Sequence, residues 1–296
     1  MMAAPSITNR QLSILIINPN TSARMTDALK PIINGLNYAE VRFSYFTAPS
    51  ESVTLPDGRI IHGLPSINCG EDSVMSALHC RPFLLPLVSK YDGFLVACYS
   101  AHPLVGMLKE EIKKLEDAAT ASATTTKLRR RYVTGIFETS VTISLSLISS
   151  FVLLDEHQLS KSQVKDTFGV ISTGKVWEEE LRKAVTEMLA DPSGQRGNSE
   201  RFAGVKTTGL TAIELHSTPP EIVRQKIIEA TESLIKDTFH PVGAICMGCA
   251  GMAGMEEAVR EGCVKVYGKQ QGHRVRIVDG VVAGAGILVA SCKAGF

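Results

Sequence analysis

Two cysteines stand where an apolar, strand-like run ends. Cys98 follows the run 93–97, and Cys249 follows the run 244–248. A thiol at the junction of a strand and a helix lies near the first free amides and the positive dipole end of that helix, which lowers its pKa and favours the reactive thiolate. We therefore expect catalytic cysteines that are alkylated selectively. The alternative is that each is a small apolar residue at a strand end.

Cys246 and Cys249 also form a C-x-x-C pair, a spacing found in zinc sites and in thioredoxin-type dithiols. A zinc site needs two further ligands, and the sequence has no second C-x-x-C and no H-x3-H spacing. Phosphate-loop, G-x-G-x-x-G and H-E-x-x-H motifs are absent as well, so we expect no metal and no cofactor. A thiol-disulfide oxidoreductase that uses Cys246 and Cys249 remains an alternative.

Polar side chains follow two further strand-like runs. Asn18 and Asn20 come after the first β-branched run of the chain, and Ser172 and Thr173 come after the run 168–171. Open α/β sheets bind ligands at the carboxyl ends of their strands, so these residues are candidate substrate contacts. The same residue types also suit turns and helix caps, and both interpretations stay open.

Two more side chains could assist the thiols. His102 is four residues after Cys98 and could hold or relay its proton across one helical turn, although Pro103 disturbs that geometry. A surface or capping histidine is the alternative. Glu138 is a candidate carboxylate behind the site, or simply an acidic residue in the first turn of a helix.

The elements that must position these residues alternate as in an α/β protein with mainly parallel strands. Apolar residues recur at helical spacing after the strand-like runs 93–97 and 168–171, and Pro219-Pro220-Glu221 opens a helix before the run 243–247. Pro31 lies inside another helical pattern and predicts a kink or a break there. The four clearest strands are 12–17, 93–97, 168–171 and 243–247.

The order of these features repeats along the chain. Each half shows a polar strand end and then a cysteine, and Cys98 and Cys249 are 151 residues apart, close to half of the 296 residues. We therefore predict two similar lobes, each a mainly parallel sheet flanked by helices, related by a pseudo-twofold axis with one thiol from each.

Composition excludes several classes of protein. The chain has 31 Lys and Arg residues and 30 Asp and Glu residues, so its charge is balanced and no basic surface for nucleic acid is indicated. The longest weakly polar stretches are Gly-rich and shorter than the roughly 20 residues of a spanning helix, so no membrane partner is expected. Seven cysteines are too sparse for a disulfide scaffold, and we expect reduced thiols in the cytoplasm.

Three motifs can be considered together: IINPNTS at 16–22, VACYS at 96–100 and GCAGM at 248–252. Further short segments of interest are 133–138, Gly209-Leu210 and 278–281. In this order, and over nearly the whole chain, the sequence resembles the aspartate/glutamate/hydantoin racemase superfamily, most closely its hydantoin and allantoin racemase branch.

The resemblance implies two α/β lobes with the site in the cleft between them and one catalytic cysteine from each, Cys98 and Cys249. We expect lobe 1 to comprise approximately residues 12–115 together with the C-terminal segment 270–296. Lobe 2 is expected to comprise approximately residues 132–269. Segments 117–131 and 191–201 are expected to be surface loops. Carried over by motif, the substrate or oxyanion contacts are Asn18, Asn20, Ser100, Ser172, Thr173, Ala250 and Gly251.

The implied activity is cofactor-independent racemisation of a cyclic ureide, either allantoin or a 5-substituted hydantoin. One cysteine, as thiolate, would remove the acidic hydrogen of the ring carbon while the other, as thiol, delivers a proton to the opposite face. Backbone amides beside Ser100 and Ala250 would stabilise the enolate oxygen. Tyr99-Ser100, where amino-acid racemases tend to carry Asn-Thr, favours a neutral cyclic amide over a free amino acid.

Some departures from the branch leave alternatives open. Ala101-His102-Pro103 replaces an Asp-Pro-Gly-like turn of relatives, which bears on substrate choice. The same fold hosts amino-acid racemases, maleate isomerases and malonate decarboxylases, and a non-catalytic binding module also fits the sequence. By resemblance we expect a homo-oligomer that acts in nitrogen metabolism.

Overall fold

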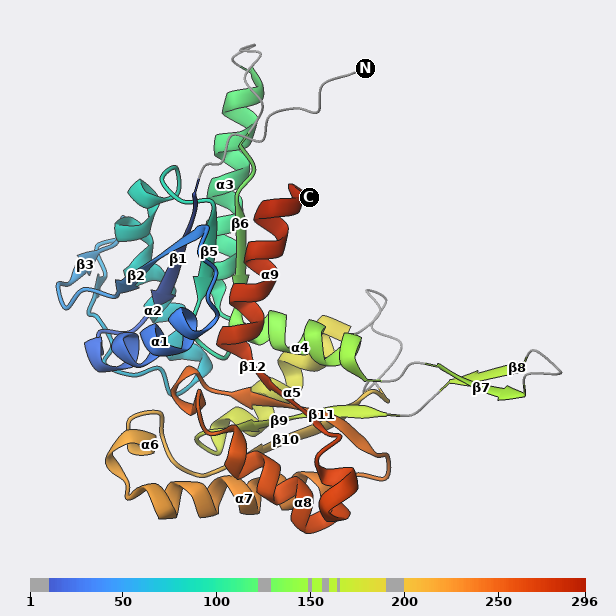
Figure 1. Ribbon diagram of the computed structural model, residues 1–296. Coiled ribbons are helices and arrows are strands. Elements are labelled where there is room, and N and C mark those ends of the chain that lie inside the picture. Colours follow the sequence, from blue (N-terminus) through green and yellow to red (C-terminus); the bar gives the residue numbers. More distant parts are fainter. Residues whose placement is uncertain (1–10, 122–128, 149–150, 156–159, 164–165, 190–199) are drawn as a thin grey trace, which may run out of the picture.

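Two four-stranded parallel sheets form the framework of the computed structural model, which describes residues 11–121, 129–148, 151–155, 160–163, 166–189 and 200–296 (Figure 1). In both sheets the strand that comes first in the chain lies between the second and the third, so the strand order is the same. The first sheet, in order, is β2 (Val41–Thr47), β1 (Leu12–Asn18), β5 (Gly93–Val96) and β6 (Tyr132–Gly135). The second is β10 (Phe202–Thr207), β9 (Thr167–Ser172), β11 (Val242–Gly248) and β12 (Arg276–Asp279). The predicted two-lobed α/β fold is confirmed.

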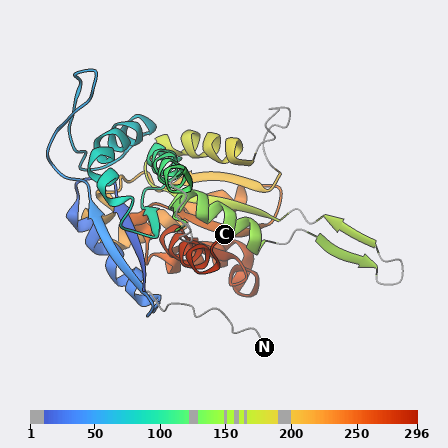
Figure 2. The same cartoon turned by 90° about the horizontal axis from the view of Figure 1, so that it is seen from above.

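Helices connect and cover the strands, and two short hairpins stand outside the sheets. The hairpin β7–β8 projects from the body of the molecule (Figure 2). The long helices are α1 (Ala23–Gly35), α2 (Gly70–Leu84), α3 (Pro103–Ala121), α4 (Ile136–Leu147), α5 (Val176–Leu189), α7 (Pro220–Lys236), α8 (Glu256–Gly272) and α9 (Gly280–Ala294). The short elements are α6 (Glu214–Ser217), η1 (Leu85–Leu87), η2 (Ala250–Met252), β3 (Val53–Thr54), β4 (Ile60–Ile61), β7 (Phe151–Asp155) and β8 (Ser160–Gln163).

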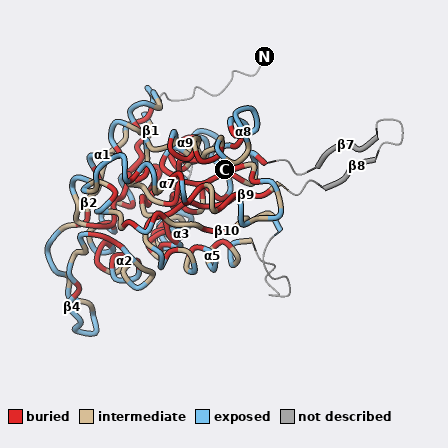
Figure 3. Tube along the Cα trace, turned by 90° about the horizontal axis from the view of Figure 1, so that it is seen from below, coloured by how far each residue is buried: buried red, intermediate tan, exposed pale blue. Residues whose placement is uncertain are grey.

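The central strands are buried on both faces, because helices cover each sheet on two sides (Figure 3). In β1, Ile14 and Ile16 pack into one apolar cluster, while Leu15 and Ile17 pack into another on the opposite face. This explains why the sequence of β1 is a continuous apolar run rather than an alternating one.

Two helices cross from one lobe to the other. α4 follows β6 of the first sheet but packs on β11 and β12 of the second, whereas α9 follows β12 but packs on β5 and β6. Gly284 of α9 allows a close approach, because a methyl group there would overlap the side chain of Leu95 in β5. The exchange ties the two lobes together.

The strands and helices expected from the sequence are present, and their ends differ by at most a few residues. The expected break at Pro31 is absent: α1 continues through this residue as a single helix. Proline removes only one helical hydrogen bond, and the buried face formed by Leu29 and Ile33 holds the helix on the sheet across that position.

The expected lobe boundaries need correction at two strands. Residues 132–135 were assigned to lobe 2 but form β6, which pairs with β5 of the first sheet. The segment 270–296 was assigned to lobe 1, yet its residues 276–279 form β12, which pairs with β11 of the second sheet. The crossing helices explain both errors, since each lobe ends with a strand whose next helix belongs to the other lobe.

The two expected surface loops are only partly described. α3 extends to Ala121, so the beginning of the segment 117–131 is helical rather than a loop. Residues 122–128 and 191–199 lie outside the described part of the chain. Within the described ranges, no helix combines the length and the hydrophobicity that crossing a membrane requires.

Helix α9 is capped by Asp279, whose Oδ1 accepts hydrogen bonds from the amides of Val281 at 2.7 Å and Val282 at 3.1 Å. Replacing Asp279 by Ala should lower the free energy of unfolding by about 1 kcal/mol, because two helix amides lose their acceptor. Asp279→Asn keeps an acceptor oxygen and should lose less. Urea unfolding of the three proteins checks this, and equal stability of D279A and wild type would contradict the capping role.

Candidate active site

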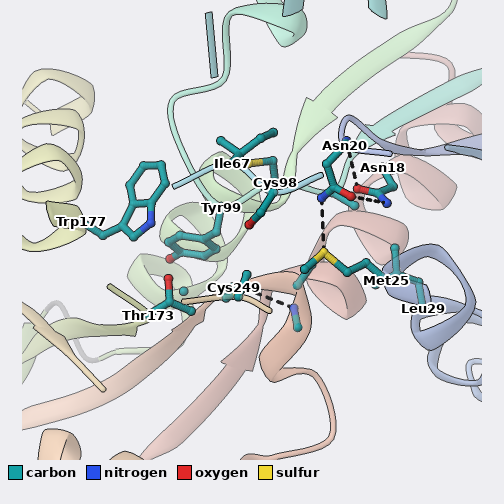
Figure 4. A pocket seen from close by; sticks show the side chains of 16 residues that line it. Asn18, Asn20, Met25, Leu29, Ile67, Cys98, Tyr99, Thr173, Trp177 and Cys249 are labelled. Carbon is teal, nitrogen blue, oxygen red and sulfur yellow. Dashed lines mark hydrogen bonds between the residues drawn. The ribbon is translucent and has the colours of Figure 1, made fainter. Parts of the chain in front are cut away.

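A cavity lies where the carboxyl ends of the central strands of both sheets meet (Figure 4). Asn18 ends β1 and Cys98 follows β5 in the first lobe, while Thr173 follows β9 and Cys249 follows β11 in the second. Parallel strands bring their carboxyl ends to one edge of a sheet, so two sheets of the same order bring four such ends together. Of the residues expected to form the site, Asn18, Asn20, Cys98, Thr173, Cys249, Ala250 and Gly251 line this cavity.

The cavity is small. Its volume is about 50 Å³, whereas ligand pockets usually hold about 300–1,000 Å³. Two hydrogen bonds join the lobes beside it: the Gly70 amide donates to Glu180 Oε1 at 2.9 Å, and Arg24 Nη2 donates to the His216 carbonyl at 3.1 Å. In this arrangement of the lobes, a ring-sized ligand needs more room than the cavity offers.

None of the described residues that line the cavity is charged. The side chains are amides, hydroxyls, thiols and apolar groups, with Trp177, Tyr99 and Ile67 among the larger ones. A substrate carboxylate would lose its water here without gaining a cationic partner, which is costly. The cavity suits a neutral polar ligand.

Cys98 lies between β5 and α3, with its Sγ 3.5 Å from the Ser100 hydroxyl. Ser73 of α2 donates to the same hydroxyl at 3.3 Å, so Ser100 positions the thiol rather than lining the cavity. Burial raises the pKa of Cys98 to about 12, although the Ser100 hydrogen bond acts in the opposite direction. The charges of Cys249 and Glu138 raise it further.

Cys249 is the N-cap of η2, and its Sγ accepts a hydrogen bond from the Gly251 amide at 3.3 Å. The expected amide donor is thus present. Burial nevertheless raises the pKa of Cys249 to about 11. The pKa is raised rather than lowered as expected for both cysteines, because burial penalises the thiolate more than the nearby donors stabilise it.

The two cysteines of the C-x-x-C pair have different surroundings in the structure. Cys246 is fully buried in β11, and its Sγ lies 3.1 Å from the hydroxyl of Ser144 in α4, whereas Cys249 faces the cavity. All seven cysteines lie in the described part of the chain, and all are free thiols. No group of His, Cys, Asp and Glu side chains in the described residues is arranged to hold a metal ion.

The turn after β1 is held together by Asn18. Its Nδ2 donates to Asn20 Oδ1 at 3.1 Å, to the Ser22 carbonyl at 3.0 Å and to Thr26 Oγ1 at 3.0 Å. Asn20 Nδ2 has only a weak acceptor, the Met25 sulfur at 3.3 Å. Asn20 is therefore the residue of this turn with a donor to offer a ligand, and Asn18 positions it.

The two polar residues at the end of β9, Ser172 and Thr173, also have different roles. Ser172 is buried, and its Oγ donates to the Gly248 carbonyl at 2.7 Å, which ties β9 to the strand that carries Cys249. Thr173 lines the cavity. Of the two expected contacts, Thr173 is placed to meet a ligand, and Ser172 supports the backbone before Cys249.

His102 and Glu138 lie outside the cavity lining. His102 is buried, its Nδ1 accepts from the Leu104 amide at 3.3 Å, and burial lowers its pKa to about 3. It therefore takes the capping role that the sequence left open. The Glu138 carboxylate fills the space that a side chain at Gly135 would need, and burial raises its pKa.

Most of the cavity wall was not predicted from the sequence, above all Trp177. This residue lies in the first turn of α5, belongs to the buried face of that helix and reaches the cavity. A usable signal exists, because a helix that follows a strand begins at the ligand-binding edge of the sheet. Trp177 is also the only tryptophan of the chain.

The raised pKa values predict slow alkylation. In the folded protein at pH 7.5, iodoacetamide should modify Cys98 and Cys249 at least about tenfold more slowly than free glutathione, because the reactive thiolate is scarce. The rates should keep rising beyond pH 9. Peptide mass spectrometry over a pH series measures both sites, and rates that level off near pH 8.5 would contradict the assignment.

Curated relatives match along nearly the whole chain. An uncharacterized protein of Schizosaccharomyces pombe is 28% identical over 279 residues, which cover 94% of this chain and 91% of that protein. Protein DCG1 of Saccharomyces cerevisiae is 26% identical over 252 residues, covering 82% and 84%.

Solved structures share the fold. An allantoin racemase from Pseudomonas fluorescens superposes with a TM-score of 0.66 at 18% identity, covering 96% of this chain and 92% of that one. An allantoin racemase from Klebsiella pneumoniae gives 0.65 at 19% identity, covering 96% and 89%.

The sequence profile of the Asp/Glu/Hydantoin racemase family matches residues 14–153 and 156–288. The match includes both strand ends that carry the cavity cysteines, and it agrees with the duplicated parallel sheets. The family supports an isomerase. The chain belongs to the Asp/Glu/hydantoin racemase family.

Proposed function

We propose that the protein is a cofactor-independent racemase of a neutral cyclic ureide, either allantoin or a 5-substituted hydantoin. The observation that carries the proposal is a cavity lined by one thiol from each lobe and by no charged side chain among the described residues. Inversion at a ring carbon needs a proton acceptor on one face and a donor on the other, and a neutral ring needs no cationic partner. The fold that the chain shares with two allantoin racemases supports the same substrate class.

In the proposed reaction, one cysteine as thiolate takes the proton from the ring carbon, and the other as thiol delivers a proton to the opposite face. The roles exchange in the reverse direction. The amide of Asn20 and the hydroxyl of Thr173 supply hydrogen bonds to the ring. Burial makes each thiolate scarce but also more basic, which suits it to removing a proton from carbon.

Replacing either cavity cysteine by Ser should abolish racemisation, because one face of the carbon then lacks its proton carrier. In deuterated buffer, each variant should still exchange the ring hydrogen of one enantiomer only, and Cys98→Ser and Cys249→Ser should select opposite enantiomers. Chiral chromatography and mass spectrometry on single-enantiomer allantoin and 5-benzylhydantoin measure both quantities.

The matched control is Cys69→Ser, because Cys69 caps α2 without a side-chain hydrogen bond and does not line the cavity. It should retain wild-type activity. Background racemisation is subtracted, and EDTA is present throughout. Substantial racemisation by both cavity variants would defeat the two-thiol mechanism, and wild-type inactivity on every cyclic ureide would defeat the substrate class.

The pH profile should follow the raised thiol pKa values. Active enzyme carries one thiolate, and because both pKa values lie above the ordinary thiol value, the thiolate fraction grows throughout the neutral and mildly alkaline range. The ratio kcat/KM should therefore rise from pH 6.5 to pH 9.5 without levelling. Initial rates at low substrate concentration, corrected for background, check this, and a plateau near pH 8 would show that the pKa values are not raised.

A further inference from the structure

His216 carries a buried imidazole nitrogen on the side of Gly251 that also borders Cys249. The residue lies in α6, which packs against η2, the short helix that Cys249 caps. Its Nε2 is shielded from solvent and has no hydrogen-bond partner among the described residues. A buried polar nitrogen without a partner calls for an explanation, because leaving it unpaired costs free energy.

The space beside Gly251 is bordered by both His216 Nε2 and the Cys249 sulfur. A methyl group added to Gly251 would lie 3.1 Å from His216 Nε2 and 3.5 Å from Cys249 Sγ. The imidazole nitrogen and the sulfur thus border one space, which any residue other than glycine would fill. Proton transfer across such a space needs a small approach of the two groups or one intervening water, both common when a site closes on its substrate.

The surroundings keep the resting His216 imidazole neutral. Burial lowers its pKa, and the positive charge of Arg24 from the opposite lobe lowers it further. Arg224 of α7 and Glu257 of α8 line a second cavity together with His216, and Arg224 is paired with Glu261. Arg24 also holds the backbone of His216 through its carbonyl.

We propose that His216 is a positioning residue that relays the proton of Cys249. Its Nε2 receives the proton of the Cys249 thiol, which leaves a thiolate ready to take the ring hydrogen, and it returns that proton when Cys249 must again be a thiol. No electrons are transferred, and the imidazolium balances the thiolate charge. The relay rests on the proposed function of Cys249.

The first lobe is arranged differently in the described residues. The group beside Cys98 is the hydroxyl of Ser100. The histidine of that lobe, His102, accepts a hydrogen bond from the Leu104 amide through Nδ1, and its buried Nε2 also lacks a partner among the described residues, but no contact there joins its ring to Cys98. The relay therefore predicts an effect on one thiol only. Cys98 becomes an internal control in the same molecule.

The decisive experiment measures alkylation of the two thiols by iodoacetamide from pH 6.5 to 9.5, site by site with peptide mass spectrometry. His216→Asn should slow modification of Cys249 by about tenfold near pH 8 and leave Cys98 within about twofold, because only Cys249 loses its proton acceptor. The matched control is His273→Asn, an exposed histidine at the end of α8. It should change neither rate.

Racemisation supplies the second readout. His216→Asn and His216→Gln should lower kcat by about 10²-fold with little change in KM, the usual scale of a lost acid-base group. Imidazole should partly restore His216→Gly, because His216 borders a cavity of about 640 Å³ through which a small ring can enter. Urea unfolding of each variant separates this loss from misfolding.

The outcomes separate the relay from the proposed function. Unchanged Cys249 alkylation in both folded variants, Asn and Gln, would overturn the relay even if the protein is a racemase. A selective loss of Cys249 alkylation would support the relay even if none of the cyclic ureides is racemised. Equal slowing at Cys98 and Cys249 would overturn it, since that pattern reports a general change of the cleft.

Discussion

The meeting of two parallel sheets at their carboxyl edges constrains the rest of the structure. Both sheets have the same strand order, and each supplies a central strand that is followed by a cysteine. The two thiols therefore reach one cavity from different lobes, as the proposed two-thiol reaction requires. The crossing helices α4 and α9 then hold the two edges against each other.

Burial sets the acidity of the two cavity thiols. Exclusion of water raises the pKa of both cysteines, so each thiolate is a stronger base and a rarer one. The surroundings of the two sulfurs differ. Cys98 lies beside the hydroxyl of Ser100, whereas Cys249 accepts a hydrogen bond from the Gly251 amide and borders the same space as His216. The symmetry of the fold therefore does not extend to the environment of the two sulfurs.

The parts of this structure that depend on local sequence could be predicted. β1 is a continuous β-branched run, and the cysteines follow such runs directly, so their place at the carboxyl edge is readable from the chain. The sheet that β6 or β12 joins could not be predicted, because a short strand pattern carries no information about its partner.

The pKa values of the thiols and the cavity residues that are distant in sequence could not be predicted either. The pKa of Cys98 rises because burial penalises its thiolate, and no local motif reports that burial. Trp177 reaches the cavity from a helix whose sequence pattern suggests only packing. Asn18 was placed correctly at the cavity, while its bonding inside the turn was visible only in three dimensions.

The crossing of α9 has a consequence for how the protein is made. Residues 280–294 supply the helix that covers β5 and β6, so the first lobe lacks part of its core until these residues have been synthesised. Until then, the sheet formed by β2, β1, β5 and β6 has part of an apolar face uncovered, and such a state is open to aggregation and to chaperone binding.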